Sequence, residues 1–442
     1  MKSFKPFILI WAGQVVSVLG SSLSWFAIGV WIYQKTGSAS QFAWVALCTA
    51  LPQMLVSPFA GVLIDRYNRR WVMALADGGA AFGTLLLAVF FLSGRIQVWN
   101  IYLITAMSAA CNAIQVPAYS ALVASIVPHE QLGRANGMIQ FGQGLADILA
   151  PAIAGLLVLT IKVPGILMID LTTFFVAALM LVLVRMPRQV FLPQAAPISP
   201  APKRDWRADL RAGWNALRAQ SGLLNLLRYQ TLFSFLWSLF GVLVVPMILG
   251  FSGPEGLGLV LSLAGAGLLT GSLVLSAWGG PRRKLTGILA FELVSALAFC
   301  LMGLRPLLWL VAVAALLAHS TLAFVSSLSE AIWQGRVEKP FQGRVFALKQ
   351  ALVKTATLLA YSIAGGLADR VLEPLGYAGA FAGTLGAWFG VGGGRGIAAL
   401  FFLIGLVKAV SVLWVYFSPA THQLEQDLSP IYQSAKKIGA VH

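Results

Sequence analysis

Apolar segments long enough to cross a lipid bilayer recur along almost the entire chain. A transmembrane helix needs about 20 predominantly apolar residues. The first six such segments lie at 7–33, 42–63, 71–93, 99–124, 134–160 and 163–185, and the second six at 229–250, 256–278, 285–304, 306–328, 344–368 and 396–417. Charged residues make up only 10% of the chain, whereas soluble domains carry about 25%. We therefore expect an all-α polytopic membrane protein with twelve transmembrane helices.

Basic residues are distributed unequally between the two sides of such a protein. Twelve spans place both termini on one side, where 23 of the 31 Lys and Arg residues fall if those near the ends of spans are included, against six on the opposite side and two deeper within spans. Loops rich in Lys and Arg remain in the cytoplasm. The sequence therefore predicts cytoplasmic termini, and this distribution explains the net charge of +16 without a nucleic-acid partner.

The segment 186–228 separates the two groups of spans. Its Pro-rich part, 192–202, is typical of an extended linker. Beyond that linker, apolar residues recur at helical spacing among arginines: Trp206, Leu210, Trp214 and Leu217. This pattern favours an amphipathic helix on the membrane surface, in contact with anionic lipid head groups. The alternative is a helix packed on the cytoplasmic face of the bundle.

The two halves of the chain resemble each other weakly. Residues 121–134 and 331–344 share several positions at a constant offset of 210 residues, and the basic segment 279–284 follows the eighth span as 61–70 follows the second. Two groups of six spans in parallel halves are typical of two-bundle transporters. We expect a six-helix bundle at 1–185, a cytoplasmic linker with an amphipathic helix at 186–228, a second six-helix bundle at 229–417 and a cytoplasmic tail at 418–442.

A charged motif of ten residues joins the second and third spans. It runs Gly61-Val-Leu-Ile-Asp65-Arg66-Tyr-Asn-Arg69-Arg70, and at every defined position it resembles the G-x-x-x-D-R-x-x-R-R motif of the major facilitator superfamily. The resemblance implies two six-helix bundles with a substrate cavity between them, open alternately to each side. It also implies that Asp65, as an anion near arginines and a helix N-terminus, latches the cytoplasmic ends of the bundles. The alternative is a solvated loop that only fixes orientation.

Other stretches resemble one branch of that superfamily, the drug exporters related to bacterial macrolide efflux proteins. They lie at 11–14, 36–39, 117–121, 134–137, 342–346 and 390–396. Two departures weaken the implication of proton antiport. The span 99–124 contains no basic residue, where antiporters often carry an arginine, and the exporter motif of the fifth helix is degenerate at 146–155 around Pro151.

Ionisable side chains within spans are costly and usually face a cavity or a partner. Asp147 is the most central acid, about 13 residues into its span, or roughly 20 Å at about 1.5 Å per residue. Four residues are candidates for coupling transport to an ion: Asp147, Asp170, Glu292 and His319. The alternative for each is a hydrogen-bonded structural role.

Three more charged residues lie within or near the spans. Asp77 is expected to support the charge network of the 61–70 motif, and Lys354 or Lys408 could neutralise buried acids. The sequence does not indicate which acid either lysine would meet.

Polar and aromatic side chains in the spans suggest a substrate cavity. The candidates are Gln14, Asn112, Gln115, Trp25 and Trp237, with Phe26, Phe235 and Phe240 as further aromatic walls. A mostly apolar cavity with few polar groups suits an amphipathic organic molecule. The alternative is that the aromatic side chains face lipid.

Several chemistries are not indicated by the sequence. It contains no G-x-x-x-x-G-K-[ST] phosphate loop, and its four scattered histidines do not form a metal-ligand cluster. Cys48, Cys111 and Cys300 each lie within an apolar span and are expected to be small buried side chains. We therefore expect no cofactor, no metal and no enzyme activity.

With the family resemblance, these features predict a multi-pass protein of the bacterial cytoplasmic (inner) membrane. The expected function is export of amphipathic small molecules, drugs or macrolide-like compounds, by alternating access and proton antiport. Expected partners are the substrate, membrane lipids and protons, and the protein is expected to be monomeric. The alternatives are a dedicated siderophore or secondary-metabolite exporter, a lysophospholipid transporter, or a transport-inactive sensor or scaffold.

Overall fold

The protein is all-helical in the part of the chain that the computed structural model describes, namely residues 4–128, 131–184, 214–215, 217–218, 221–281, 283–337, 339–374, 389–390 and 392–417. The first half contains α1 (Lys5–Thr36), α2 (Ala39–Arg66), α3 (Arg69–Leu92), α4 (Val98–Ile126), α5 (Leu132–Thr160) and α6 (Lys162–Leu183). The second half contains α8 (Ser221–Leu249), α9 (Pro254–Trp278), α10 (Lys284–Leu304), α11 (Leu308–Arg336), α12 (Lys339–Leu367), the π-helical turn η3 (Ala368–Leu372) and α15 (Arg395–Phe417). Within these residues, twelve helical segments are long and apolar enough to cross a membrane, as predicted.

The charged motif at 61–70 is more helical than the sequence suggested. Helix α2 ends at Arg66 and α3 begins at Arg69, so only Tyr67 and Asn68 separate the two helices. The Asn68 side chain accepts a hydrogen bond from the Arg70 backbone N–H at 3.0 Å. This cap satisfies one of the N–H groups that the first turn of a helix leaves free. The motif therefore contains the end of α2, a two-residue corner and the start of α3, whereas the predicted spans left residues 64–70 between the helices.

Most of the segment 186–228, including Trp206 and Leu210, lies outside the described residues, as does the tail 418–442. Leu217 is described, and it is fully buried in a hydrophobic cluster with residues of α8, α10 and α11. Its burial favours the alternative in which this part of the chain packs on the helices.

The described helices divide between two compact units. The first comprises Met1–Pro200, Val242–Ser262 and Tyr361–Val371, and the second comprises Ala201–Gly241, Leu263–Ala360 and Leu372–His442. The first unit therefore holds α1 to α6 together with one end each of α8, α9 and α12.

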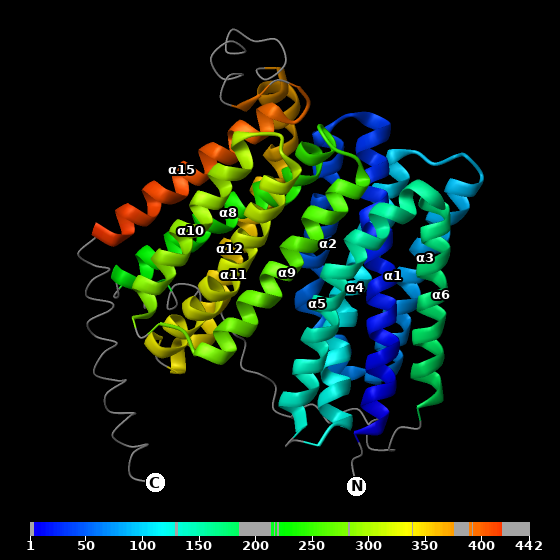
Figure 1. Cartoon of the computed structure of the whole chain (residues 1–442). Helices are drawn as coiled ribbons and strands as arrows, with labels where there is room; N and C mark the ends of the chain where they lie inside the picture. Colours follow the sequence, from blue (N-terminus) through cyan, green and yellow to red (C-terminus); the bar gives the residue numbers. More distant parts are fainter. Residues whose placement is uncertain are drawn as a thin grey trace. The chain divides into compact units, whose positions relative to one another are not determined.

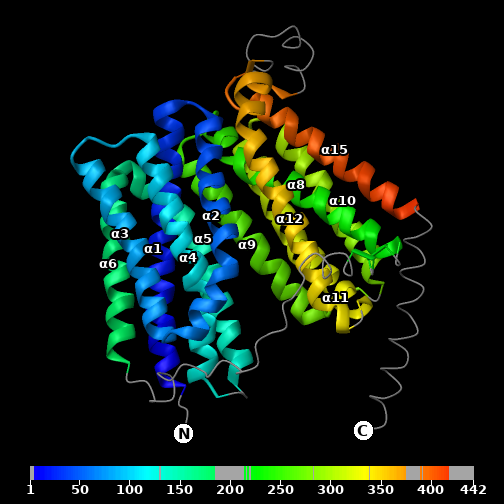
Figure 2. The ribbon, with the colours of Figure 1, turned by 180° about the vertical axis from the view of Figure 1, so that it is seen from behind.

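Close helix packing defines the first unit. Helix α1 packs along α5 and α6, and α4 packs along both α2 and α3 (Figures 1 and 2). Gly20 of α1 faces α6 so closely that an added Cβ would collide with the Thr173 side chain and lie 3.1 Å from the Asp170 Cα. Small residues at such points let helix backbones approach each other within a membrane.

A carboxylate from later in the chain completes the N-terminus of α2 in this unit. Asp369 of η3 accepts hydrogen bonds from the Ser38 hydroxyl at 2.6 Å and from the backbone N–H groups of Ala39 and Ser40, each at 2.9 Å. The first turn of α2 has no acidic residue of its own. Asp369 thus supplies the negative charge that a helix N-terminus favours.

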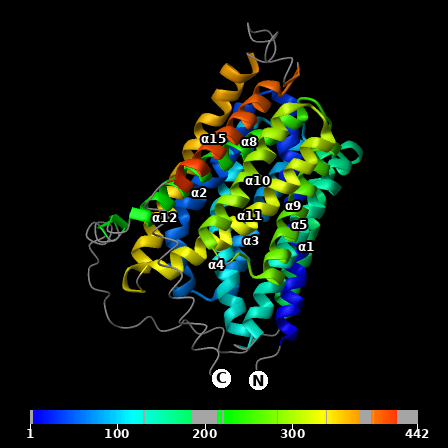
Figure 3. The same ribbon diagram turned by 60° about the vertical axis from the view of Figure 1, so that its left-hand side comes forward.

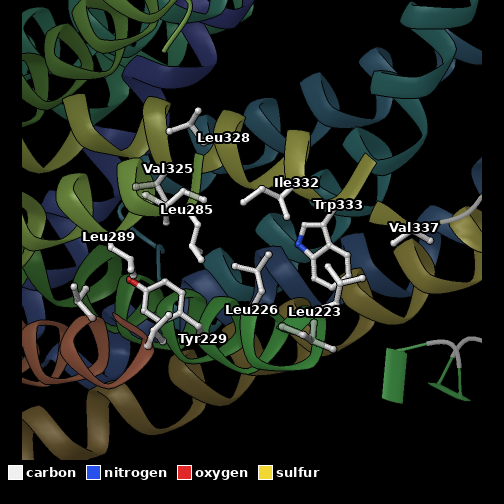
Figure 4. Close-up of a cluster of buried hydrophobic side chains, with 14 of the residues drawn as sticks. Leu223, Leu226, Tyr229, Leu285, Leu289, Val325, Leu328, Ile332, Trp333 and Val337 are labelled. Carbon is white, nitrogen blue, oxygen red and sulfur yellow. The ribbon is translucent and has the colours of Figure 1, made fainter. Parts of the chain in front are cut away.

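In the second unit, α10 packs along α11 and α15 (Figure 3). A hydrophobic cluster lies where α8, α10 and α11 meet, and Figure 4 shows Leu226 of α8 facing Ile332 and Trp333 of α11. Trp333 is fully buried, and its indole N–H donates to the Gln230 side-chain oxygen at 2.8 Å. This bond satisfies the one polar atom that the Trp333 side chain brings into the cluster.

Candidate functional site

A polar cavity of about 370 Å³ lies inside the first unit. Helices α1, α3, α4 and α6 form most of its wall, and α2 adds Thr49. Its lining includes two carboxylates, Asp77 and Asp170, and no lysine, arginine or histidine among the residues the structure describes. Two acids without a basic partner in a mostly apolar membrane bundle are costly unless a proton, a cation or hydrogen bonds stabilise them.

Asp77 occupies one part of the cavity in a chain of amide contacts. The Gln115 side chain donates to the Gln14 side-chain oxygen at 3.1 Å, and Gln14 in turn donates to an Asp77 carboxylate oxygen at 3.3 Å. Asp77 thus contacts α1 and faces the cavity, whereas the sequence predicted that it supports the 61–70 motif. Asp77 lies on the side of α3 that faces α1 and α4, which carry Gln14 and Gln115.

Asp170 forms a second polar cluster in the same cavity. One carboxylate oxygen accepts a hydrogen bond from the Ser21 hydroxyl at 3.0 Å, and the other accepts from the Thr84 hydroxyl at 3.2 Å. These three residues come from α6, α1 and α3 respectively. Asp170 is only 5% exposed, so hydroxyl dipoles rather than bulk water stabilise its carboxylate.

The structure gathers most of the predicted cavity residues at this site. Gln14, Gln115, Asn112 and Trp25 all line the cavity, together with Phe174. Three serines that were not predicted from the sequence also line the cavity: Ser17, Ser21 and Ser24. With Gln14 they follow one another at spacings of 3, 4 and 3 residues, which marks a polar stripe along α1.

Glu292 and Lys408 form a buried ion pair in the second unit. Lys408 Nζ lies 3.0 Å from Glu292 Oε2 and donates a hydrogen bond to the Ser295 hydroxyl at 2.7 Å. The ammonium also lies over the Phe233 and Phe299 rings, 4.5 and 4.8 Å from their centroids. Lys408 is therefore the partner of Glu292, whereas Lys354 is exposed.

Aromatic rings pack next to this pair. Trp237 contacts the rings of Phe240, Phe299 and His319 at centroid distances of 5.5, 5.6 and 5.1 Å. His319 Nδ1 lies 2.9 Å from the backbone oxygen of Ala315, one turn earlier on α11. This local bond and the ring contacts fit a packing role for His319. Phe26 is buried in the first unit, and Phe235 is partly buried on α8.

Asp147 is half-buried on α5 and accepts a hydrogen bond from the Gln143 side chain at 3.1 Å. That donor lies one turn earlier on the same helix, and Asp147 is not among the residues that line the cavity. Its depth in the span therefore does not bring it to the polar site.

The arginines of the 61–70 motif bind the ends of neighbouring helices. Arg69 donates to the backbone oxygen of Ala121 at 3.1 Å, and Arg70 donates to those of Leu181 and Val182 at 2.7 and 3.0 Å. The carbonyl groups of Leu181 and Val182 belong to the last turn of α6, where helix carbonyls lack intrahelical partners and favour cations, whereas Ala121 lies more than one turn before the end of α4. Arg66 and Gly61 are exposed, and the Asp65 side chain lies outside what the structure describes.

Twelve membrane-length helices in the described part of the chain and the match to a transporter superfamily define a multi-pass membrane transporter rather than an enzyme. The chain belongs to the Major Facilitator Superfamily, whose family model matches residues 10–361. The predicted all-α class with twelve spans and the predicted superfamily are confirmed.

Two curated bacterial efflux proteins are similar to most of this chain. Macrolide efflux protein A of Streptococcus pyogenes is 27% identical over 371 residues, which cover 83% of this chain and 90% of that protein. Multidrug efflux pump Tap of Mycobacterium tuberculosis is 27% identical over 379 residues, covering 82% and 87% respectively. The predicted relationship to the drug-exporter branch is confirmed, and the protein is a multi-pass protein of the bacterial inner membrane.

A solved structure supports the same fold. A POT family transporter in complex with 5-aminolevulinic acid matches with a TM-score of 0.70 at 13% identity, covering 95% of this chain and 98% of that chain.

Proposed function

We propose that this protein exports amphipathic small molecules, drugs or macrolide-like compounds, by alternating access driven by proton antiport. The observation that carries the proposal is the cavity of the first unit, where two carboxylates lie among apolar and small hydroxyl-bearing side chains. Such a site offers apolar area to the body of a substrate and a few polar groups that fix its orientation. The relatives named macrolide and multidrug efflux proteins support this substrate class.

Asp170 is the strongest of the four coupling candidates. Glu292 already has a cationic partner, His319 bonds its own helix, and Asp147 bonds Gln143. Asp170 is deeply buried and lines the cavity. The described residues that line this cavity include no lysine, arginine or histidine. Protonation of its carboxylate would remove a buried charge, and this gives the proton a large effect on the energy of the site.

We further propose the orientation and organisation that the sequence predicts. The termini and the 61–70 motif would be cytoplasmic, because the basic residues concentrate on their side. Residues 1–185 and 229–417 would be the two moving bundles, with Asp65 as the latch at their cytoplasmic ends. The monomer would be the functional form.

The test is accumulation of fluorescent amphipathic drugs and a labelled macrolide in everted membrane vesicles energised by respiration. The expected result is uptake by vesicles that contain the protein, abolished by a proton uncoupler and reduced in Asp170→Asn. Thr160→Val is a suitable control, because the exposed Thr160 hydroxyl donates to the backbone oxygens of Leu156 and Leu157 in its own helix. Absence of uncoupler-sensitive uptake across the panel would contradict the proposal.

A further inference from the structure

The surroundings of Asp170 hold more oxygen atoms than a proton site requires. A proton carrier needs one carboxylate that changes its charge, but Asp170 also meets the hydroxyls of Ser21 and Thr84. Ser24, one turn from Ser21 on α1, adjoins the same carboxylate. Carboxylate and hydroxyl oxygens from α1, α3 and α6 therefore converge at one point.

The Ser24 hydroxyl is a further observation at this point. Ser24 is 5% exposed and lines the cavity, yet its Oγ makes no hydrogen bond of acceptable geometry within the described part of the chain. A buried hydroxyl without a partner is costly. Coordination of an ion by the Ser24 oxygen would offset this cost.

We propose that Asp170, Ser21, Ser24 and Thr84 form a binding site for a sodium ion. All of the ligand atoms would be hard oxygens, the type that hard metal cations prefer. One positive ion beside one carboxylate leaves the buried site neutral, as a membrane interior demands. The hydroxyls would rotate so that their lone pairs face the ion, because a hydroxyl both donates and accepts.

Close packing of α1 on α6 favours a small ion over the amine of an organic substrate. A Cβ added at Gly20 would lie 3.1 Å from both the Asp170 Cα and one of its carboxylate oxygens. Little space therefore remains between the two helices on this side of the carboxylate. The same cavity also extends to Asp77 and Asn112, and this other part would be left to a larger molecule.

This inference rests on the proposed function only where it concerns coupling, because sodium and the proton would then be alternative ions for the same carboxylate. Binding itself can be measured without transport. Failure to bind sodium would leave uncoupler-sensitive export intact, and failure to export would leave sodium binding intact.

The experiment is equilibrium binding of radioactive sodium to the purified full-length protein in detergent, with choline chloride holding the ionic strength constant. Wild-type protein is expected to bind one sodium ion saturably. Asp170→Asn is expected to abolish binding, and Ser21→Ala and Thr84→Val are each expected to weaken it by about tenfold, or about 1.4 kcal/mol. The hydroxyl variants keep the carboxylate, so they separate a sodium site from a simple proton site.

Ser120→Ala and Thr160→Val are the matched controls, because each removes an exposed hydroxyl that bonds its own helix in the same unit. Both are expected to bind sodium like wild type. The proposal is overturned if wild type binds no sodium, if Asp170→Asn binds it equally well, or if Ser21→Ala and Thr84→Val match their controls. It is likewise overturned if methylammonium binds saturably at Asp170 while sodium does not displace it.

Discussion

Lys408 Nζ lies 3.0 Å from Glu292 Oε2 inside the second unit, and the two side chains are only 3% and 0% exposed. The pair joins α15 to α10, which pack along each other. Attraction between opposite charges is strong where water is excluded, but so is the cost of removing each charge from water. The pair therefore stabilises the unit chiefly because neither charge is left alone.

Loss of one partner should destabilise the protein more than loss of both. We expect Glu292→Gln to lower the free energy of unfolding by about 3–5 kcal/mol, because it leaves the Lys408 ammonium uncompensated. The double variant Glu292→Gln with Lys408→Met should recover much of this loss. Denaturant unfolding in detergent micelles measures both, and equal destabilisation of the single and double variants would show that the two charges do not compensate each other.

The close approach of α1 and α6 at Gly20 predicts a steric effect. Gly20→Ala should lower the free energy of unfolding by about 1–3 kcal/mol, the usual cost of overpacking, because the new methyl group meets the Thr173 side chain. Adding Thr173→Ala should restore part of the loss by removing the obstructing atom. Gly137→Ala on α5, where a Cβ meets nothing within 4 Å, is the control and should be neutral or stabilising. Thermal unfolding that ranks Gly137→Ala below Gly20→Ala would contradict this packing.

The contacts of Asp369 predict that this residue, late in the chain, stabilises the N-terminus of α2. Asp369→Ala removes the acceptor for Ser38, Ala39 and Ser40, and loss of a cap costs about 1 kcal/mol. Asp369→Asn keeps one acceptor oxygen and should lose less. Hydrogen exchange at the first turn of α2 measures the effect locally. Unchanged exchange of the Ala39 and Ser40 amides in Asp369→Ala would exclude the cap.

The 61–70 motif predicts a functional effect without a stability effect. Asp65→Asn should reduce drug export strongly at unchanged expression, because a neutral side chain no longer binds arginines or a helix N-terminus as tightly. Tyr67→Phe is the control, since Tyr67 is an exposed neighbour at a variable position of the motif. Export by Asp65→Asn at the rate of Tyr67→Phe would leave the motif with an orienting role only.

Local patterns in the sequence were sufficient to predict the helices and part of the site. Runs of apolar residues predicted twelve spans because the energetics of crossing a bilayer depend on composition over about 20 residues. Gln14, Gln115 and Asn112 were found as polar residues in apolar spans, since such residues seldom face lipid. Helix α2 continues three residues beyond the predicted end of the second span, because a helix can extend past the apolar residues that define the span.

Partnerships between distant residues required the tertiary structure. The sequence showed that Asp77, Asp170 and Glu292 lie within spans, but not that Asp77 meets Gln14, that Asp170 meets Ser21, or that Glu292 meets Lys408. Each pairing depends on how two helices are rotated and how closely they pack, and residues far apart in the chain decide both. The sequence by itself determined the membrane class, the spans and the family motif, because these follow from local composition and spacing. Only the packing of α1 against α6 and of α10 against α15 decided which carboxylate faces a polar cavity and which is neutralised by a lysine.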